Sequence, residues 1–387
     1  MNFIPYGQHF IDSNDIRSVS KALKQKKITS GDEVTKFEKK LRDFFGSEFA
    51  TVCNSGTSAL FLAFSSINLK KKENIIMPSI NFVASYNVAK LFGANVFLAD
   101  VNKNTGQMSP DDVIACCKKN NLKKVKVILT MYNGGYPQDA EKFFILKKKL
   151  RCLIIEDACH ALGAKYKYKD NSFKIGSCKH ADISTFSLHP LKSITTGEGG
   201  IVTTNSKILD RKIKELRSLG INRDYKNHWK YDVLHYGLNL RLNDFQCALG
   251  ISQLKKLNSF IKYRKIIAER YSKELKDLPD IHIPNYLKNY NSSYHLYIIN
   301  LKLKNLPLKE KLIKFMLKNK IILQYHYIPL YKFTVFNDKY IGKNAEHYYQ
   351  SSVSLPIYYG LKYNEQTKVI KLLKLFLKKY FKKYNLS

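Results

Sequence analysis

The chain has 387 residues, and 44% of them are hydrophobic, which is typical of a globular protein and excludes a disordered one. Its 66 basic residues outnumber its 31 acidic residues and give a formal net charge of +35. No stretch reaches the roughly 18 apolar residues that cross a bilayer, and the N-terminus lacks the features of a secretory signal, so we expect a soluble cytoplasmic protein without a membrane partner.

Over the first 250 residues, predicted strands alternate with predicted helices. The strands are expected at 49–53, at 74–77 and within ANVFLADV, VKVILTMYNGG, RCLIIEDACHALGA, ADISTFSLHPLK and GGIVTTNS, and two of the helices near 57–67 and 82–92. This alternation requires crossover connections and predicts a mostly parallel sheet that is buried on both faces.

The pattern changes after residue 250. The run DFQCALGISQLKKLNSFIKYRKIIAERYSKEL predicts a long helix, and SYHLYIINLKL, a helix near 308–319 and a terminal helix predict a smaller α+β unit. We therefore expect an α/β protein with a large domain over residues 1–250 and a small domain over residues 251–387.

The terminal helix is basic on one face and apolar on the other. Its basic face carries Lys371, Lys374, Lys378 and Lys382. Such a helix can lie on a membrane surface, but a terminal helix packed on its own domain with a solvated lysine face is more common. We favour the packed helix.

Three polar clusters follow predicted strands. They are Asn54–Ser58, Asp157–His160 and Ser187–Lys192. In a parallel sheet the carboxyl ends of the strands lie along one edge, and ligands bind there. We therefore expect these clusters, which are far apart in sequence, to converge on one site.

Each cluster has an ordinary interpretation and a functional one. Small hydroxyl residues at 54–58 cap many helices, but a helix start with unpaired N–H groups also binds phosphate. Asp157 suits a helix cap, or the carboxylate that holds a protonated pyridine nitrogen. A lysine such as Lys192, if removed from water, offers a neutral amine that forms Schiff bases. Together these parts are what a pyridoxal phosphate (PLP) enzyme requires.

Several motifs resemble the DegT/StrS family of PLP-dependent sugar aminotransferases, and the likeness extends over nearly the whole chain. The most specific are ITTGEGG at 194–200 and the Asn-x-Arg-x-Asn-Asp run at 239–244. IPYG at 4–7, the His-Pro pair before Lys192 and QYHY at 324–327 point to the branch that serves pseudaminic acid biosynthesis. The resemblance implies a PLP-dependent transferase of fold type I, as in aspartate aminotransferase, and a homodimer with a shared active site.

The resemblance also implies a role for each matching residue. Lys192 would be the catalytic residue, which binds the cofactor and moves protons between cofactor and substrate. Asp157 would pair with the pyridine nitrogen, and His160 would lie near the phenolic oxygen. The other implied cofactor-binding residues are Gly56, Thr57, Phe82 (stacked on the ring), Ser187 and Asn239 (from the other subunit). The implied substrate-binding residues are Tyr6, Lys26, Lys27, Ile28, Thr29, Gly56, Ser187, Asn239, Gln324, Tyr325, His326 and Tyr327.

Two positions depart from the family pattern. Leu188 stands where phenylalanine is usual, and Gly56 stands where some relatives carry alanine, which affects packing near the sugar. A dehydratase branch of the family replaces the lysine with histidine, whereas this chain keeps Lys192. The resemblance therefore favours transamination.

The implied reaction moves the amino group of L-glutamate, by way of PLP, to C4 of a UDP-linked 4-keto-6-deoxy-N-acetylhexosamine. The same chemistry on another nucleotide 4-keto sugar, of the perosamine or aminoarabinose type, stays open at this point. Both interpretations predict a nucleotide sugar and an amino acid as substrates.

The net charge also suits a non-catalytic protein that binds nucleic acid. However, only nine of the basic residues are arginines, and the lysines are spread along the chain. We therefore predict no nucleic-acid partner and an attraction for anionic substrates. The seven cysteines include no C-x-x-C pair, which predicts reduced thiols and no metal site.

Overall fold

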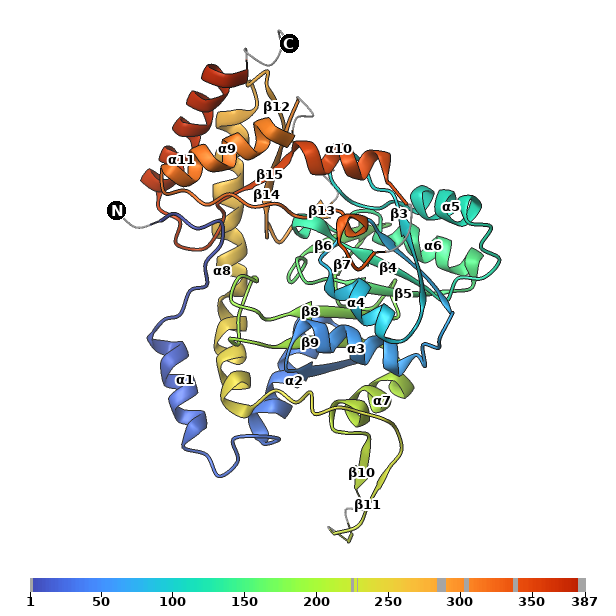
Figure 1. Ribbon diagram of the computed structural model, residues 1–387. Coiled ribbons are helices and arrows are strands. Elements are labelled where there is room, and N and C mark those ends of the chain that lie inside the picture. The colour runs from blue at the N-terminus through green and yellow to red at the C-terminus, as the bar shows by residue number, and fades with distance from the viewer. Residues whose placement is uncertain are drawn as a thin grey trace.

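The computed structural model describes residues 3–223, 226–227, 229–283, 290–302, 306–336 and 340–381. Figure 1 shows a large region around a central sheet, a smaller region that contains the C-terminal helices, and the long helix α8 running between them. In the described ranges, no helix is both long enough and apolar enough to cross a bilayer.

A seven-stranded sheet forms the centre of the large region, with the strand order β1-β9-β8-β5-β4-β2-β3. The neighbours from β8 to β3 pair in parallel, whereas β9 is antiparallel to both β8 and β1. The strands are β1 (Phe49–Cys53), β2 (Asn74–Pro78), β3 (Asn95–Ala99), β4 (Val127–Met131), β5 (Leu153–Asp157), β8 (Ile183–Ser187) and β9 (Gly200–Thr204). The mostly parallel sheet expected from the sequence is confirmed.

Helices cover both faces of this sheet. Successive residues of β2 point to opposite faces, so that Ile75 and Met77 join one core cluster and Ile76 another. This explains why the strands are continuously apolar rather than alternating. One face is covered by α3 (Gly56–Ser66), α4 (Ala84–Leu91) and α7 (Lys207–Arg217), and the other by α2 (Asp32–Phe45), α5 (Pro110–Lys119), α6 (Ala140–Leu150) and part of α8.

Helix α8 (Asp244–Leu275) connects the two regions. Its 32 residues extend over about 48 Å. Leu257 packs in the core beside the large sheet, and Tyr271 packs in the core of the small region. The division that we predict at residue 250 falls inside this continuous helix, and it stays a prediction.

The small region is built on a three-stranded antiparallel sheet with helices against it, which confirms the expected α+β arrangement. Its elements are β12 (Ile281–His282), β14 (Tyr297–Leu301), β15 (Ser352–Leu355), α9 (Leu306–Lys318), α10 (Lys343–Ser351) and α11 (Tyr363–Phe376), which the turn η3 (Leu377–Phe381) extends. Phe376 of α11 is buried in this core, and Lys374 pairs with Glu274 of α8 at 3.2 Å. The terminal helix therefore packs on its own domain as favoured, although Lys382 lies outside the described residues.

The remaining elements lie at the periphery. Helix α1 packs along α8, where the buried carboxylate of Asp15 accepts hydrogen bonds from Gln253 and Lys256. A small sheet of β6, β7 and β13 and a separate β10–β11 hairpin complete the fold. These elements are α1 (Ser13–Leu23), β6 (Lys165–Tyr168), β7 (Asn171–Lys174), β10 (Ile221–Arg223), β11 (Tyr231–Val233), β13 (Tyr290–Asn291), η1 (Asn133–Gly135) and η2 (Leu330–Lys332).

Candidate active site

A cavity of about 540 Å³ lies at the carboxyl ends of β1, β5 and β8. All three polar clusters predicted from the sequence contribute to its wall, through Ser55–Thr57, Asp157 with His160, and Ser187 with Lys192. The segment 324–328 and Tyr6 line it from the small region. A volume of this size is typical of a pocket for a cofactor or a small organic substrate.

The N-terminus of α3 forms one end of the cavity. Ser55 caps this helix by accepting a hydrogen bond from the Ser58 N–H at 3.0 Å, and the Ser58 hydroxyl donates to Asn54 at 2.6 Å. A Cβ atom on Gly56 would lie 2.8 Å from Cβ of Ser187, so that glycine allows the end of β8 to approach the helix. The free N–H groups and the helix dipole make this end suitable for a phosphate group.

Asp157 and Lys192 line the same cavity from neighbouring positions. Asp157, at the end of β5, is 4% exposed and accepts a hydrogen bond from Ser85 of α4 at 2.7 Å. Burial lowers the pKa of Lys192 below its ordinary value, and the nearby Cys159 and Asp157 oppose this effect. A larger fraction of such a lysine is the neutral amine near neutral pH, and the neutral amine is the form that acts as a nucleophile or accepts a proton.

Three buried histidines also line the cavity. The rings of His160 and His295 lie 4.2 Å apart, and Nε2 of His160 is hydrogen-bonded to the Tyr327 hydroxyl at 2.8 Å. Nδ1 of His326 is hydrogen-bonded to Ser354 at 2.8 Å. Burial lowers the pKa of His160 and His295 well below the ordinary value, and that of His326 to about 3. All three imidazoles are therefore neutral at physiological pH.

Phe82 gives the cavity an exposed aromatic surface. The helix expected near 82–92 is confirmed as α4, which begins at Ala84, so Phe82 lies just before it. The Phe82 N–H donates to the Asn81 side chain at 2.7 Å. Its side chain is 55% exposed and lines the cavity near the Tyr327 ring, where it can stack on a planar ligand.

Two predicted segments do not line the cavity of their own chain. Residues 26–29 are exposed between α1 and α2, and Asn239 pairs with Ser218 at the base of the β10–β11 hairpin. Thr29 pairs with Asn243, four residues beyond Asn239. The two segments are therefore neighbours in the fold, and neither lines the cavity.

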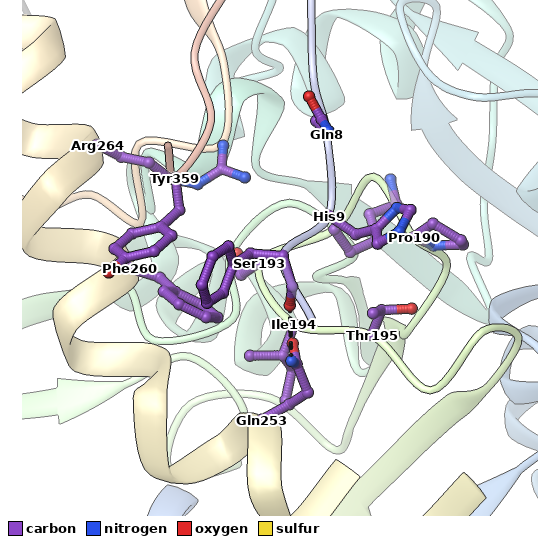
Figure 2. A pocket seen from close by; sticks show the side chains of 12 residues that line it. Gln8, His9, Pro190, Ser193, Ile194, Thr195, Gln253, Phe260, Arg264 and Tyr359 are labelled. Carbon is purple, nitrogen blue, oxygen red and sulfur yellow. Dashed lines mark hydrogen bonds between the residues drawn. The ribbon is translucent and has the colours of Figure 1, made fainter. Parts of the chain in front are cut away.

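A second pocket, of only about 10 Å³, lies behind the loop that carries Lys192, and Figure 2 shows its lining residues. The guanidinium of Arg264 extends into it from α8 and donates to the backbone oxygens of His295 at 3.3 Å and Ile357 at 2.9 Å. Burial lowers the pKa of Arg264 to about 10. The pocket has room for about one water, so Arg264 serves to fix the backbone beside the main cavity.

Sequence reasoning missed several residues of this site. His295 lies in a segment that we interpret from the sequence only as part of the small α+β unit, and Ser85 lies on a predicted helix. Cys159 was visible within the cluster 157–160 but received no role, although it lines the cavity between Asp157 and His160. No sequence pattern identifies His295 as a site residue, because a single histidine beside an apolar run has no characteristic spacing.

The donor set fits PLP. The N-terminus of α3 matches its phosphate, Asp157 its pyridine nitrogen, Lys192 its aldehyde and Phe82 its ring face. The close approach of Gly56 and Ser187 leaves a cradle that a Cβ atom would fill. The fold and this site define a PLP-dependent enzyme of fold type I.

Within that class, residues 9–374 match the DegT/DnrJ/EryC1/StrS aminotransferase family, and the chain belongs to this family. The family resemblance seen in the motifs is thereby confirmed. An aminotransferase is an enzyme, so the non-catalytic alternative is not supported.

Similar proteins include a UDP-4-amino-4,6-dideoxy-N-acetyl-beta-L-altrosamine transaminase of Campylobacter jejuni strain 81-176. It is 39% identical over 360 residues, which cover 91% of this chain and 92% of the relative. The structure of Helicobacter pylori PseC, described as an aminotransferase of pseudoaminic acid biosynthesis, is 30% identical with a TM-score of 0.90, covering 98% of this chain and 100% of that one. The PMP-form of the putative sugar aminotransferase Spr1654 of Streptococcus pneumoniae is 25% identical with a TM-score of 0.90, covering 97% and 99%.

Proposed function

We propose that this protein transfers the amino group of L-glutamate to C4 of a UDP-linked 4-keto-6-deoxy-N-acetylhexosamine. The product is UDP-4-amino-4,6-dideoxy-N-acetyl-β-L-altrosamine, an intermediate of pseudaminic acid biosynthesis, and the reaction takes place in the cytoplasm. Similarity to the Campylobacter transaminase over nearly the whole of both chains supports this substrate. The observation that carries the chemistry is the pair of Lys192 and Asp157 in one cavity.

Lys192 moves the proton in both parts of the reaction. When PLP is bound, the cofactor supplies an electron sink, and the proton on the amino-bearing carbon of the amino acid can then be removed. Because burial lowers the pKa of Lys192, its amine is more readily neutral and able to accept that proton. The same amine then delivers a proton to C4 of the sugar. General acid–base help of this kind contributes about a hundred- to ten-thousand-fold to a rate.

Asp157 and the facing residues hold and orient the reacting groups. The Asp157 carboxylate keeps the pyridine nitrogen protonated, and Ser85 orients it by donating to one of its oxygens. With PLP bound, His160 would lie near the phenolic oxygen, and Tyr327 fixes the direction of the His160 ring through their 2.8 Å hydrogen bond. The N-terminus of α3, with Gly56, Thr57 and Ser187, holds the phosphate.

The nucleotide sugar occupies the part of the cavity beside the small region. Tyr6 and the segment 324–327 form this wall. Tyr6 packs near His326 at a ring distance of 5.5 Å, and Tyr327 lies 5.9 Å from Phe82. This continuous aromatic wall suits a ligand with flat and apolar surfaces and a few hydroxyl groups.

The enzyme acts as a homodimer in which each subunit completes the other's site. Residues 26–29 and Asn239 do not line their own cavity, so the binding role that we propose for them requires a second copy. Large apolar side chains are exposed near Asn239, which is typical of a surface that another chain covers. They are Leu219, Trp229, Tyr231, Val233, Leu234, Tyr236 and Leu238.

A two-stage absorbance experiment tests this function. The visible band of the PLP-loaded protein should bleach with L-glutamate and, once the amino acid is removed, return fastest with the UDP-linked 4-keto sugar of the altrosamine pathway. If the visible band returns faster with a GDP-linked or aminoarabinose-type ketone, the substrate of this protein is that other sugar and not the UDP-linked one. A protein that shows no band after addition of PLP, and binds DNA with a steep salt dependence, would contradict the aminotransferase function.

A further inference from the structure

Lys309 of α9 is the feature of the small region that the proposed reaction does not explain. Its side chain is fully buried, at 0% exposure, although lysines almost never lie inside a protein without a charged partner. In the part of the chain that the structure describes, no carboxylate lies within ion-pairing distance of its Nζ atom. A cation in this position requires another source of stabilisation.

Two tyrosine rings supply that stabilisation. Nζ of Lys309 lies 4.0 Å from the ring centre of Tyr325 and 4.4 Å from that of Tyr349, and it donates a hydrogen bond to the backbone oxygen of Tyr349. The two rings stand nearly at right angles, with their centres 5.8 Å apart. Because both rings present electron-rich faces to one ammonium group, Lys309 holds them in a fixed arrangement.

One of these rings belongs to the wall of the main cavity. Tyr325 lines the cavity next to Gln324, whose side-chain oxygen accepts the Tyr325 N–H at 2.9 Å. Tyr349 and Lys309 do not line it. Lys309 can therefore affect a ligand in the cavity through Tyr325, whose ring it contacts.

We propose that Lys309 is a positioning residue for the nucleotide-sugar substrate, because its ammonium group fixes the Tyr325 ring against the cavity. This proposal rests on the proposed function, in which Tyr325 contacts the nucleotide sugar. It concerns binding of that substrate and leaves the proton transfer by Lys192 unchanged.

The same arrangement makes substrate binding sensitive to pH. Burial lowers the pKa of Lys309 to about 7, and Glu310 of α9 and Glu346 of α10 oppose this effect. Lys332 also faces the cluster, and it pairs with Glu346 at 2.9 Å. Below about pH 7 the ammonium holds both rings, whereas above it the neutral amine loses this attraction. Binding of the nucleotide sugar should therefore weaken as the pH rises through about 7.

Kinetics of Lys309→Met test the link to the substrate, since methionine keeps the chain length and removes the charge. Near pH 6 the KM for the nucleotide sugar should rise about 2- to 30-fold, the range expected for loss of a cation–π contact. The kcat and the KM for glutamate should stay near wild type, and the rise of KM with pH should vanish. Lys314→Met, at an exposed lysine of the same helix, is the control and should match wild type.

A measurement without substrate tests the contact itself. In wild-type protein containing 3-fluorotyrosine, the fluorine resonance that disappears in Tyr325→Phe should titrate near pH 7, and it should not titrate in Lys309→Met. Absence of this titration in the wild type overturns the proposal, even if Lys309→Met does not fold. The proposal is also overturned if the wild type titrates as expected but Lys309→Met has an unchanged KM for the nucleotide sugar. Failure of the wild-type protein to use any nucleotide sugar contradicts the proposed function alone.

Discussion

Gly56 begins α3 directly against the last residue of β8. A Cβ atom at this position would lie 2.8 Å from Cβ and 3.3 Å from Cα of Ser187, so the end of β8 would have to shift. Overpacking of this kind costs about 1–3 kcal/mol. We expect Gly56→Ala to weaken PLP binding by about five- to a hundred-fold, measured as the absorbance change on titrating the apoenzyme.

Removal of the facing Cβ atom provides a matched control for this prediction. Ser187→Gly in the Gly56→Ala background relieves the overlap, and the double variant should bind PLP more tightly than the sum of the two single effects predicts. Purely additive effects would mean that the two residues act independently of their close contact.

Lys192 lines the cavity, whereas many other lysines of this chain lie on the surface. We expect Lys192→Ala to reduce turnover by at least about a hundred- to ten-thousand-fold while calorimetry still detects binding of the nucleotide sugar. Lys118→Ala, at an exposed lysine of α5, should retain full turnover. Near-wild-type turnover of Lys192→Ala would contradict the role of this amine in proton transfer.

At the scale of elements, one carboxylate joins the starts of two helices. Helix α2 begins after Gly31, which has no side chain with which to cap it, and the buried Asp244 of α8 accepts from the N–H groups of Gly31 at 2.8 Å and Glu33 at 3.0 Å. The Asp244 N–H donates to the Ile28 oxygen at 3.0 Å. Asp244 therefore connects residues 26–29 to the run that contains Asn239.

Loss of this carboxylate should destabilise the protein and loosen both segments. We expect Asp244→Ala to lower the free energy of unfolding by about 2–4 kcal/mol, because two hydrogen bonds to a charged acceptor are lost. Urea unfolding measures this change. Asp32→Ala removes an exposed acidic residue from the same helix start and should cost less than about 1 kcal/mol. Equal losses in both variants would indicate a general charge effect instead of a specific cap.

The elements also explain how far the sequence predicts this site. Asp157 and Lys192 could be predicted to meet because the carboxyl ends of neighbouring parallel strands share one edge. His295 and Lys309 belong to the small region, whose sheet is antiparallel. No comparable rule predicts from the sequence which residues of such a sheet lie next to the cavity. Phe82 lies just before α4 with its N–H bonded to the Asn81 side chain, and sequence patterns do not fix a helix start to within two residues.

At the scale of the whole molecule, residues from both regions line the cavity, but some of the residues predicted to bind substrate do not. Helix α8 fixes the two regions relative to each other, and Arg264 near its middle donates to backbone oxygens at His295 and Ile357. Its N-terminus, however, carries Asp244 and with it the surface of residues 26–29 and Asn239, which does not line the cavity of the same chain. A single chain therefore holds the catalytic residues of one cavity, and the homodimer that we propose would bring the surface of residues 26–29 and Asn239 to the cavity of a second chain.

Hybrid dimers test this arrangement. Lys192→Ala lacks the catalytic amine, and Asn239→Ala lacks the side chain that we propose reaches the partner subunit's site, so each variant alone should be nearly inactive. After unfolding and refolding together in equal amounts, half of the dimers should be hybrids, each with one complete site, and activity should recover to about a quarter of wild type. Two batches of Lys192→Ala refolded together provide the control. If the mixture gains no activity although size-exclusion chromatography shows dimers, each chain's active site uses only its own residues.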